Sequence, residues 1–71
     1  MIQTMITRKT YRSLASALNS AIESVPTREE AAAIVDAAQK LCPALYEDNA
    51  KFDRHIFMEW VTRGTKMEGV A

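Results

Sequence analysis

Apolar side chains recur every three or four residues in the first third of the chain, which is the spacing of one face of an α-helix. This pattern predicts a helix over residues 8–24. Thr7 can cap its first turn through the hydroxyl, and Ile6 and Tyr11 can form a hydrophobic staple around that turn. A start one turn later, at Thr10, is the alternative. The apolar positions are Tyr11, Leu14, Ala15, Leu18, Ala21, Ile22 and Val25.

A second helix is predicted over residues 28–42. Thr27 and Glu30 form a capping box, and Pro26 keeps the connection to the first helix short. Pro43 either ends or kinks this helix, because it has no amide hydrogen to donate and its ring crowds the preceding turn. Residues 43–47 could add one more helical turn. The predicted inward face comprises Ala31, Ile34, Val35, Ala38, Leu41, Cys42 and Leu45.

A third, short helix is predicted over residues 54–63. Asp53 stands at its N-cap, Phe52 and Phe57 occupy the two staple positions, and Gly64 follows as the C-terminal glycine. Large side chains are needed to hold so short a helix on a core, since each contributes about 1.5 to 3 kcal/mol when buried. The apolar face continues through Ile56, Trp60 and Val61.

Together these elements predict an all-α fold, a compact three-helix domain with mobile termini that occupies residues 1–71 as a single unit. The tail from Thr65 onward shows no periodicity. For residues 1–6 an edge strand, a helical turn and disorder all remain open. A chain of 71 residues buries a small share of its surface, so its stability is marginal and a partner or a second copy would add to it.

Net charge is zero, from nine basic and nine acidic side chains, so no overall field draws the chain to nucleic acid or to a membrane surface. Cys42 is the sole cysteine and cannot form an internal disulfide. The chain contains no apolar run long enough for a signal peptide or a membrane span. We therefore expect a cytoplasmic protein without membrane contact.

Candidate chemistry is sparse. His55 and Glu59 stand four residues apart on one helix, but two ligands do not complete a zinc site, and an exposed polar pair is the favoured interpretation. Cys42 fits a buried small side chain better than a nucleophile. The oxygen-rich stretch Glu47 to Asp53 lacks the alternating ligands and central glycine of a calcium loop. We expect no enzymatic activity, no cofactor, no metal and no small-molecule substrate.

Binding a protein is the function that the sequence favours, either a foreign partner or a homo-oligomer. Met58 is predicted to point away from the core side of the third helix, beside Arg54, and not all of the aromatic side chains on that helix need face inward. Methionine is adaptable in shape, and arginine and tryptophan are frequent in interfaces. The predicted partner-binding residues are therefore Arg54, Met58 and Trp60.

The alternative is a small nucleic-acid-binding accessory protein. A basic face could be made by Arg8, Lys9, Arg12 and Arg54. The chain lacks the glycine-containing turn of a helix-turn-helix, and its second helix begins with acidic residues, which would oppose entry into a DNA groove. With zero net charge, this function ranks behind protein binding.

Residues 48–64, DNAKFDRHIFMEWVTRG, resemble the C-terminal ending of many small uncharacterised bacteriophage and bacterial helical proteins. These run Asn, two variable residues, Phe-Asp-Arg, two variable residues and Phe, and they finish near a Gly. Trp60 and Val61 depart from the pattern, and Gly64 comes late. The resemblance implies a phage or mobile-element origin, action in the host bacterial cytoplasm and, in concrete form, a modulator of a host protein. The matching residues are Asn49, Phe52, Asp53, Arg54, Phe57 and Gly64.

Overall fold

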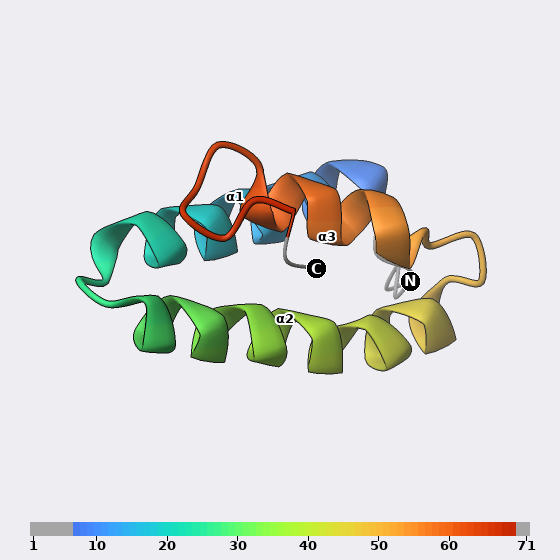
Figure 1. Cartoon of the computed structure of the whole chain (residues 1–71). Helices are drawn as coiled ribbons and strands as arrows, with labels where there is room; N and C mark the ends of the chain where they lie inside the picture. The colour runs from blue at the N-terminus through green and yellow to red at the C-terminus, as the bar shows by residue number, and fades with distance from the viewer. Residues whose placement is uncertain (1–6, 70–71) are drawn as a thin grey trace.

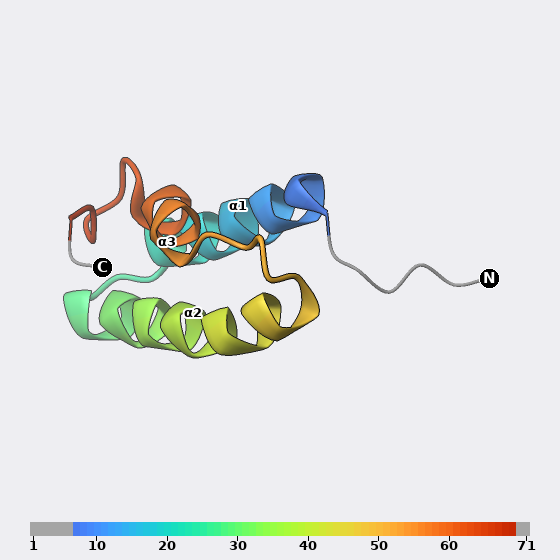
Figure 2. The ribbon, with the colours of Figure 1, turned by 90° about the vertical axis from the view of Figure 1, so that its right-hand side faces the viewer.

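A computed structural model describes residues 7–69, which form three helices. Helix α1 spans Arg8–Ser24, α2 spans Arg28–Asp48 and α3 spans Arg54–Thr62. Helices α1 and α2 run antiparallel alongside each other, and α3 lies against one side of that pair (Figures 1 and 2). The predicted all-α, three-helix fold is confirmed.

The helix starts are set by the three predicted caps. The backbone amide of Thr10 donates to the Thr7 hydroxyl, which confirms Thr7 over Thr10 as the first cap. The Glu30 amide donates to the Thr27 hydroxyl over 3.1 Å, and the Ile56 amide donates to an Asp53 carboxylate oxygen over 3.1 Å. The rings of the predicted staple, Phe52 and Phe57, have centroids 5.4 Å apart. Ile6, the other predicted staple residue, lies outside the described residues.

Helix α2 continues past Pro43, so its predicted end near residue 42 is wrong. Proline removes one backbone hydrogen bond, but the residues on either side of it keep the helix on the core, because Cys42 and Leu45 are both buried. The helix ends where the Asn49 amide donates to the Leu45 carbonyl. This extension carries Tyr46 alongside the start of α3.

Three side chains depart from their predicted burial. Met58, predicted to be exposed, is only 4 % exposed, whereas Leu41 and Ile56, predicted to face inward, are 40 % and 38 % exposed. Helix α3 packs against both α1 and α2. Its buried arc is therefore wider than one stripe and runs through Phe57, Met58, Val61 and Thr62. Ile56 falls outside that arc.

The segment from Thr65 to Gly69, which shows no periodicity in the sequence, folds back on the helices. Gly64 has φ +72°, a left-handed conformation that lets the chain reverse after α3. Met67 is 3 % exposed, and the Lys66 ammonium donates to the Val25 carbonyl at the end of α1. The tail thus closes one end of the core. Residues 70–71 lie outside the described part.

We expect Met67→Ala to lower the free energy of unfolding by about 2 kcal/mol or more, since it removes a buried side chain from the core. Urea unfolding followed by circular dichroism would measure this loss. Glu68→Ala, at the exposed neighbouring position, is the control and should change stability by less than about 0.5 kcal/mol. Equal small effects from both variants would show that the tail does not contribute to the core.

Candidate functional site

The predicted partner-binding residues do not form one surface. Met58 lines the same groove between α2 and α3 as Arg54 but is only 4 % exposed, so it offers a partner little contact. Arg54 lines the groove between α2 and α3, whereas Trp60 lies on the α1 side of α3, with the Arg12 guanidinium 5.3 Å from its ring centroid. The sequence prediction missed this division because α3 separates the two sides.

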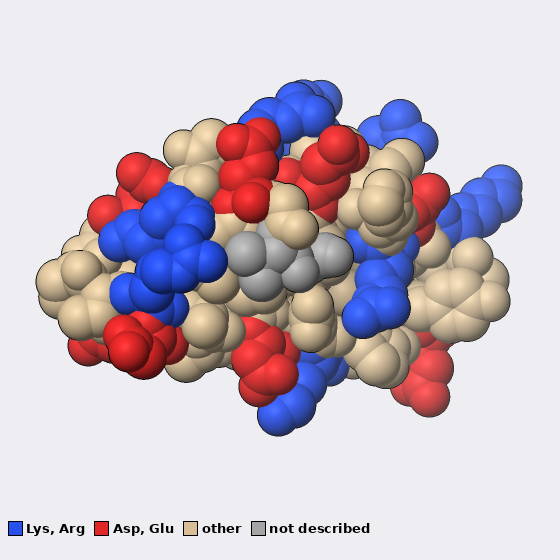
Figure 3. Space-filling view, in the orientation of Figure 1, with Lys and Arg blue, Asp and Glu red and all other residues tan. Residues whose placement is uncertain are grey.

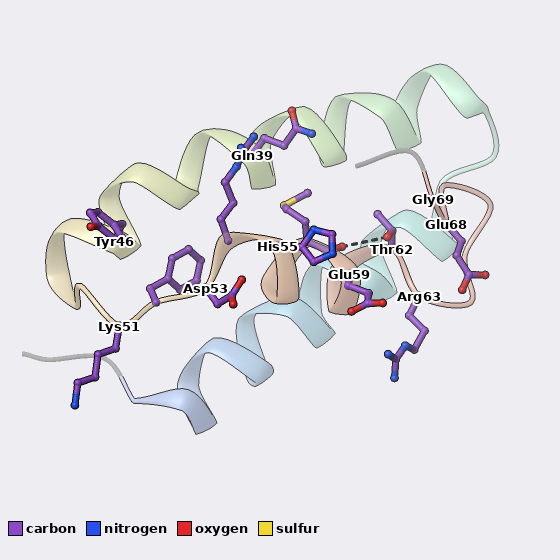
Figure 4. A pocket seen from close by; sticks show the side chains of 13 residues that line it. Gln39, Tyr46, Lys51, Asp53, His55, Glu59, Thr62, Arg63, Glu68 and Gly69 are labelled. Carbon is purple, nitrogen blue, oxygen red and sulfur yellow. Dashed lines mark hydrogen bonds between the residues drawn. The ribbon is translucent and has the colours of Figure 1, made fainter.

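The α2–α3 groove is the larger hollow, with a volume of about 880 Å³ (Figure 4). Gln39 and the 57 % exposed Tyr46 border it from α2, and the exposed His55 and Glu59 border it from α3. Its charged residues include both signs. On the face that Figure 3 shows, Lys and Arg are likewise interspersed with Asp and Glu. No field of one sign therefore selects a ligand for this groove.

Cys42 is buried on α2 and lines a smaller hollow beside this groove, together with Arg54. Burial raises the pKa of the Cys42 thiol above its ordinary value of 9.0, and the charge and hydrogen bond of Arg54 act in the opposite direction without cancelling that effect. The thiol is therefore protonated at neutral pH. A protonated, buried thiol is a poor nucleophile, in line with the packing role expected from the sequence.

Burial of Cys42 predicts a loss of stability at high pH. The unfolded thiol ionises near its ordinary pKa while the folded thiol keeps its proton, so this contribution is complete below that pKa and is lost as the pH rises through the raised value. Between pH 8 and pH 10 the wild type should lose more unfolding free energy than Cys42→Ala, measured by urea unfolding. Parallel pH curves for the two proteins would contradict this.

A second groove runs between α1 and α3 and is lined by several cationic side chains. Three of the four residues predicted as a basic face, Arg8, Lys9 and Arg12, line it, and Arg63 joins them. Arg54 does not, since it lies in the α2–α3 groove. The sequence pattern could not show that Arg63 belongs to this set, because only the docking of α3 on α1 brings it there. We call this the basic groove; it is lined by Arg8, Lys9, Arg12, Ser13, Ser16, Asn19, Trp60 and Arg63.

Asn19 holds the two walls of the basic groove together. Its side-chain amide donates to the Trp60 carbonyl over 3.3 Å and to the Arg63 carbonyl over 2.8 Å. These carbonyls belong to the C-terminal end of α3, where backbone acceptors have no partner within the helix. Asn19 therefore positions Trp60 and Arg63 against α1.

A third surface is apolar and faces away from α3. On α1, Arg12 and Asn19 point toward Trp60, so the opposite flank of the helix points away from α3. On α2, Gln39 and Tyr46 border α3, and the opposite flank again points away. The two flanks lie on the same side of the α1–α2 pair. We call this the apolar face; it comprises Leu14, Ala17, Leu18, Ala21 and Val25 along α1 with Ile34, Ala37 and Leu41 along α2.

The side chains of the apolar face are not fully covered. Leu14, Leu18, Val25 and Ile34 pack on the core but stay partly exposed, and Leu41 is 40 % exposed. Ala21 is also partly exposed, and Trp60, on the opposite side of α1, is a further large apolar side chain of this kind. Spacing of three and four residues could have revealed this second stripe, but it adjoins the core stripe and merges with it in the sequence.

The residues that carry the phage-like resemblance have structural roles. Asn49 accepts from the Lys51 amide through its side chain, Phe52 and Phe57 pack together, Asp53 caps α3 and Gly64 reverses the chain. They shape the connection into and out of α3. The motif therefore marks how this part folds, and three of its members, Phe52, Asp53 and Arg54, also line the α2–α3 groove.

Among residues 7–69, no three side chains of the His, Cys, Asp and Glu types gather closely enough to hold a metal ion. None of the helices in this described part is both long and apolar enough to cross a membrane. Compared with protein-family models, curated proteins and solved structures, the chain shows no match.

Proposed function

We propose that this chain is a non-enzymatic protein-interaction module that assembles with a second copy of itself through the apolar face. The observation that carries the proposal is that α3 covers one side of the α1–α2 pair and leaves the apolar face on the other side open. In larger helical bundles such a side is covered by a further helix. Here a two-fold-related copy would supply it.

Charge favours a second copy as the partner. The apolar face has no charged side chain among its members, and the chain's net charge is zero, so two copies do not repel each other. At the edge of the face, Asp36 and Lys40 form an exposed ion pair over 3.0 Å. This pair adds no net charge at the edge of the face.

The available area is of the right size. A standard protein interface takes about 800 Å² from each partner. That is about one sixth of the chain's accessible surface of 4999 Å². A broad side formed by two helices of 17 and 21 residues can supply an area of this order.

For the setting, we propose a reducing bacterial cytoplasm. A lone buried thiol with no cysteine partner is typical of a reducing compartment, and the phage-like ending supports a phage-encoded accessory protein. Modulation of a host protein through the same apolar face is the other form of this function.

Light scattering over a range of concentrations tests self-association. We expect the weight-average mass to rise from that of the 7.9 kDa chain toward twice that value as concentration increases. A mass that stays at one chain up to millimolar concentration would overturn the second copy as partner. Helix content, recorded on the same samples, shows whether the chain is folded.

A further inference from the structure

We propose that the basic groove binds one strand of nucleic acid, with its phosphates on the four cations and one base in the adjoining aromatic cavity. This site is separate from the apolar face and does not depend on self-association. The observation that carries it is the convergence of Arg8, Lys9 and Arg12 from α1 with Arg63 from the end of α3. The lining of this groove contains no carboxylate.

The cations match phosphate chemistry. Three of the four are arginines, whose planar guanidinium groups bind phosphate oxygens through paired hydrogen bonds. Ser13 and Ser16 add hydroxyl groups that can bond to phosphate oxygens. From Arg8 to Asn19 the groove follows about 16 Å of helix, which can accommodate two or three consecutive phosphates.

Local electrostatics at the start of α1 also favour an anion. The first turn of α1 carries no acidic residue, and it begins with Arg8 and Lys9. Cations at this end oppose the positive end of the helix dipole, so they weaken the isolated helix. A phosphate bound by the side chains of Arg8 and Lys9 would relieve this repulsion.

The groove continues into a smaller cavity of about 280 Å³ that shares Arg8 and Trp60 with it. The cavity is lined by aromatic and apolar side chains, including Phe52 and Ile56, together with the polar residues Asn49, Lys51 and Asp53. Tyr11 also lines it, is only 6 % exposed, and its hydroxyl has no hydrogen-bond partner among the described residues. A buried hydroxyl in this state is costly, and a base would satisfy it once the Tyr11 side chain shifts toward the cavity, because its oxygen is otherwise covered. Bases taken from a single strand bind in this way to aromatic sites.

An acidic protein segment fits less well. Peptide docking relies on apolar anchors in pockets along the groove. The basic groove itself offers only Trp60, and Arg12 already lies over that ring. The observations therefore favour a ligand that is charged at regular intervals.

Binding can be measured by fluorescence anisotropy of a labelled 12-nucleotide oligothymidine, with Trp60 emission as a second signal. With two or three phosphates engaged, we expect affinity to fall about 7- to 20-fold between 50 and 200 mM salt. The double variant R12Q/R63Q should weaken binding at least tenfold. The control K40Q/R54Q removes the same charge outside the groove and should stay within twofold of wild type.

Three results would overturn the proposal. These are no binding at 50 mM salt, equal losses from the two double variants, and equally effective competition by polyglutamate, which would identify an acidic-protein site instead.

Tyr11→Phe should weaken oligothymidine binding severalfold while leaving the fold intact, and unchanged affinity would rule out the cavity as the place of the base. Ala37→Glu, outside the groove, should bind normally whether or not the chain self-associates.

Discussion

Phe57→Ala is expected to remove about 3 to 5 kcal/mol of unfolding free energy. Phe57 is 1 % exposed and lies where α3 meets the rest of the core, with its ring 5.4 Å from that of Phe52. A domain of this length has a total stability of about 4 to 10 kcal/mol. The loss is therefore large enough to leave a sizeable unfolded fraction at 25 °C.

Urea unfolding at one fixed protein concentration would measure this change, because self-association would otherwise add to the stability. Ile56→Ala is the matched control, since Ile56 precedes Phe57 on α3 and is 38 % exposed. It should cost less than about 1 kcal/mol. If Phe57→Ala cost no more than Ile56→Ala, α3 would not be anchored as the structure has it.

Ala37→Glu is expected to weaken self-association at least a hundredfold, about 2.7 kcal/mol. Ala37 is exposed in the middle of the apolar face, so a carboxylate there would lose its water in the assembled form without gaining a partner. A two-fold interface places the substitution on both sides. Glutamate is a good helix former, so the single chain should keep its fold.

Ala32→Glu supplies the control for this prediction. Ala32 is an exposed alanine on the same helix, but it does not belong to the apolar face. Light scattering should give the wild-type mass profile for Ala32→Glu and a single-chain mass for Ala37→Glu. The same profile for both variants would place the interface elsewhere.

Local signals in the sequence were sufficient for the helices and their starts. Thr7, Thr27 and Asp53 cap helices because a short side-chain oxygen bonds to an amide three residues on, which depends on no distant contact. The first helix was predicted with its observed bounds. The end of α2 was missed because buried residues on both sides of Pro43 offset the lost hydrogen bond.

Which residues share a surface depends on how the helices pack, so the sequence alone could not predict it. Periodicity places Met58 and Leu41 on their helices, but the position of α3 decides that Met58 is covered and Leu41 is not. The packing of α3 also places Arg54 and Trp60 in different grooves and puts Arg63 in the same groove as Arg12. Contacts between residues more than 40 positions apart, such as Asn19 with Arg63, leave no periodic trace in a sequence.

Methyl NMR on dilution tests most directly whether the apolar face is the interface. Between millimolar and micromolar concentration, we expect the methyl signals of Leu14, Val25 and Leu41 to shift together along one binding curve. The methyl signal of Ile56, which is exposed on α3, should stay fixed. Shifts at Ile56 with none at Leu14, Val25 and Leu41, or no shift at any of these positions, would contradict the apolar face as the surface through which this chain works.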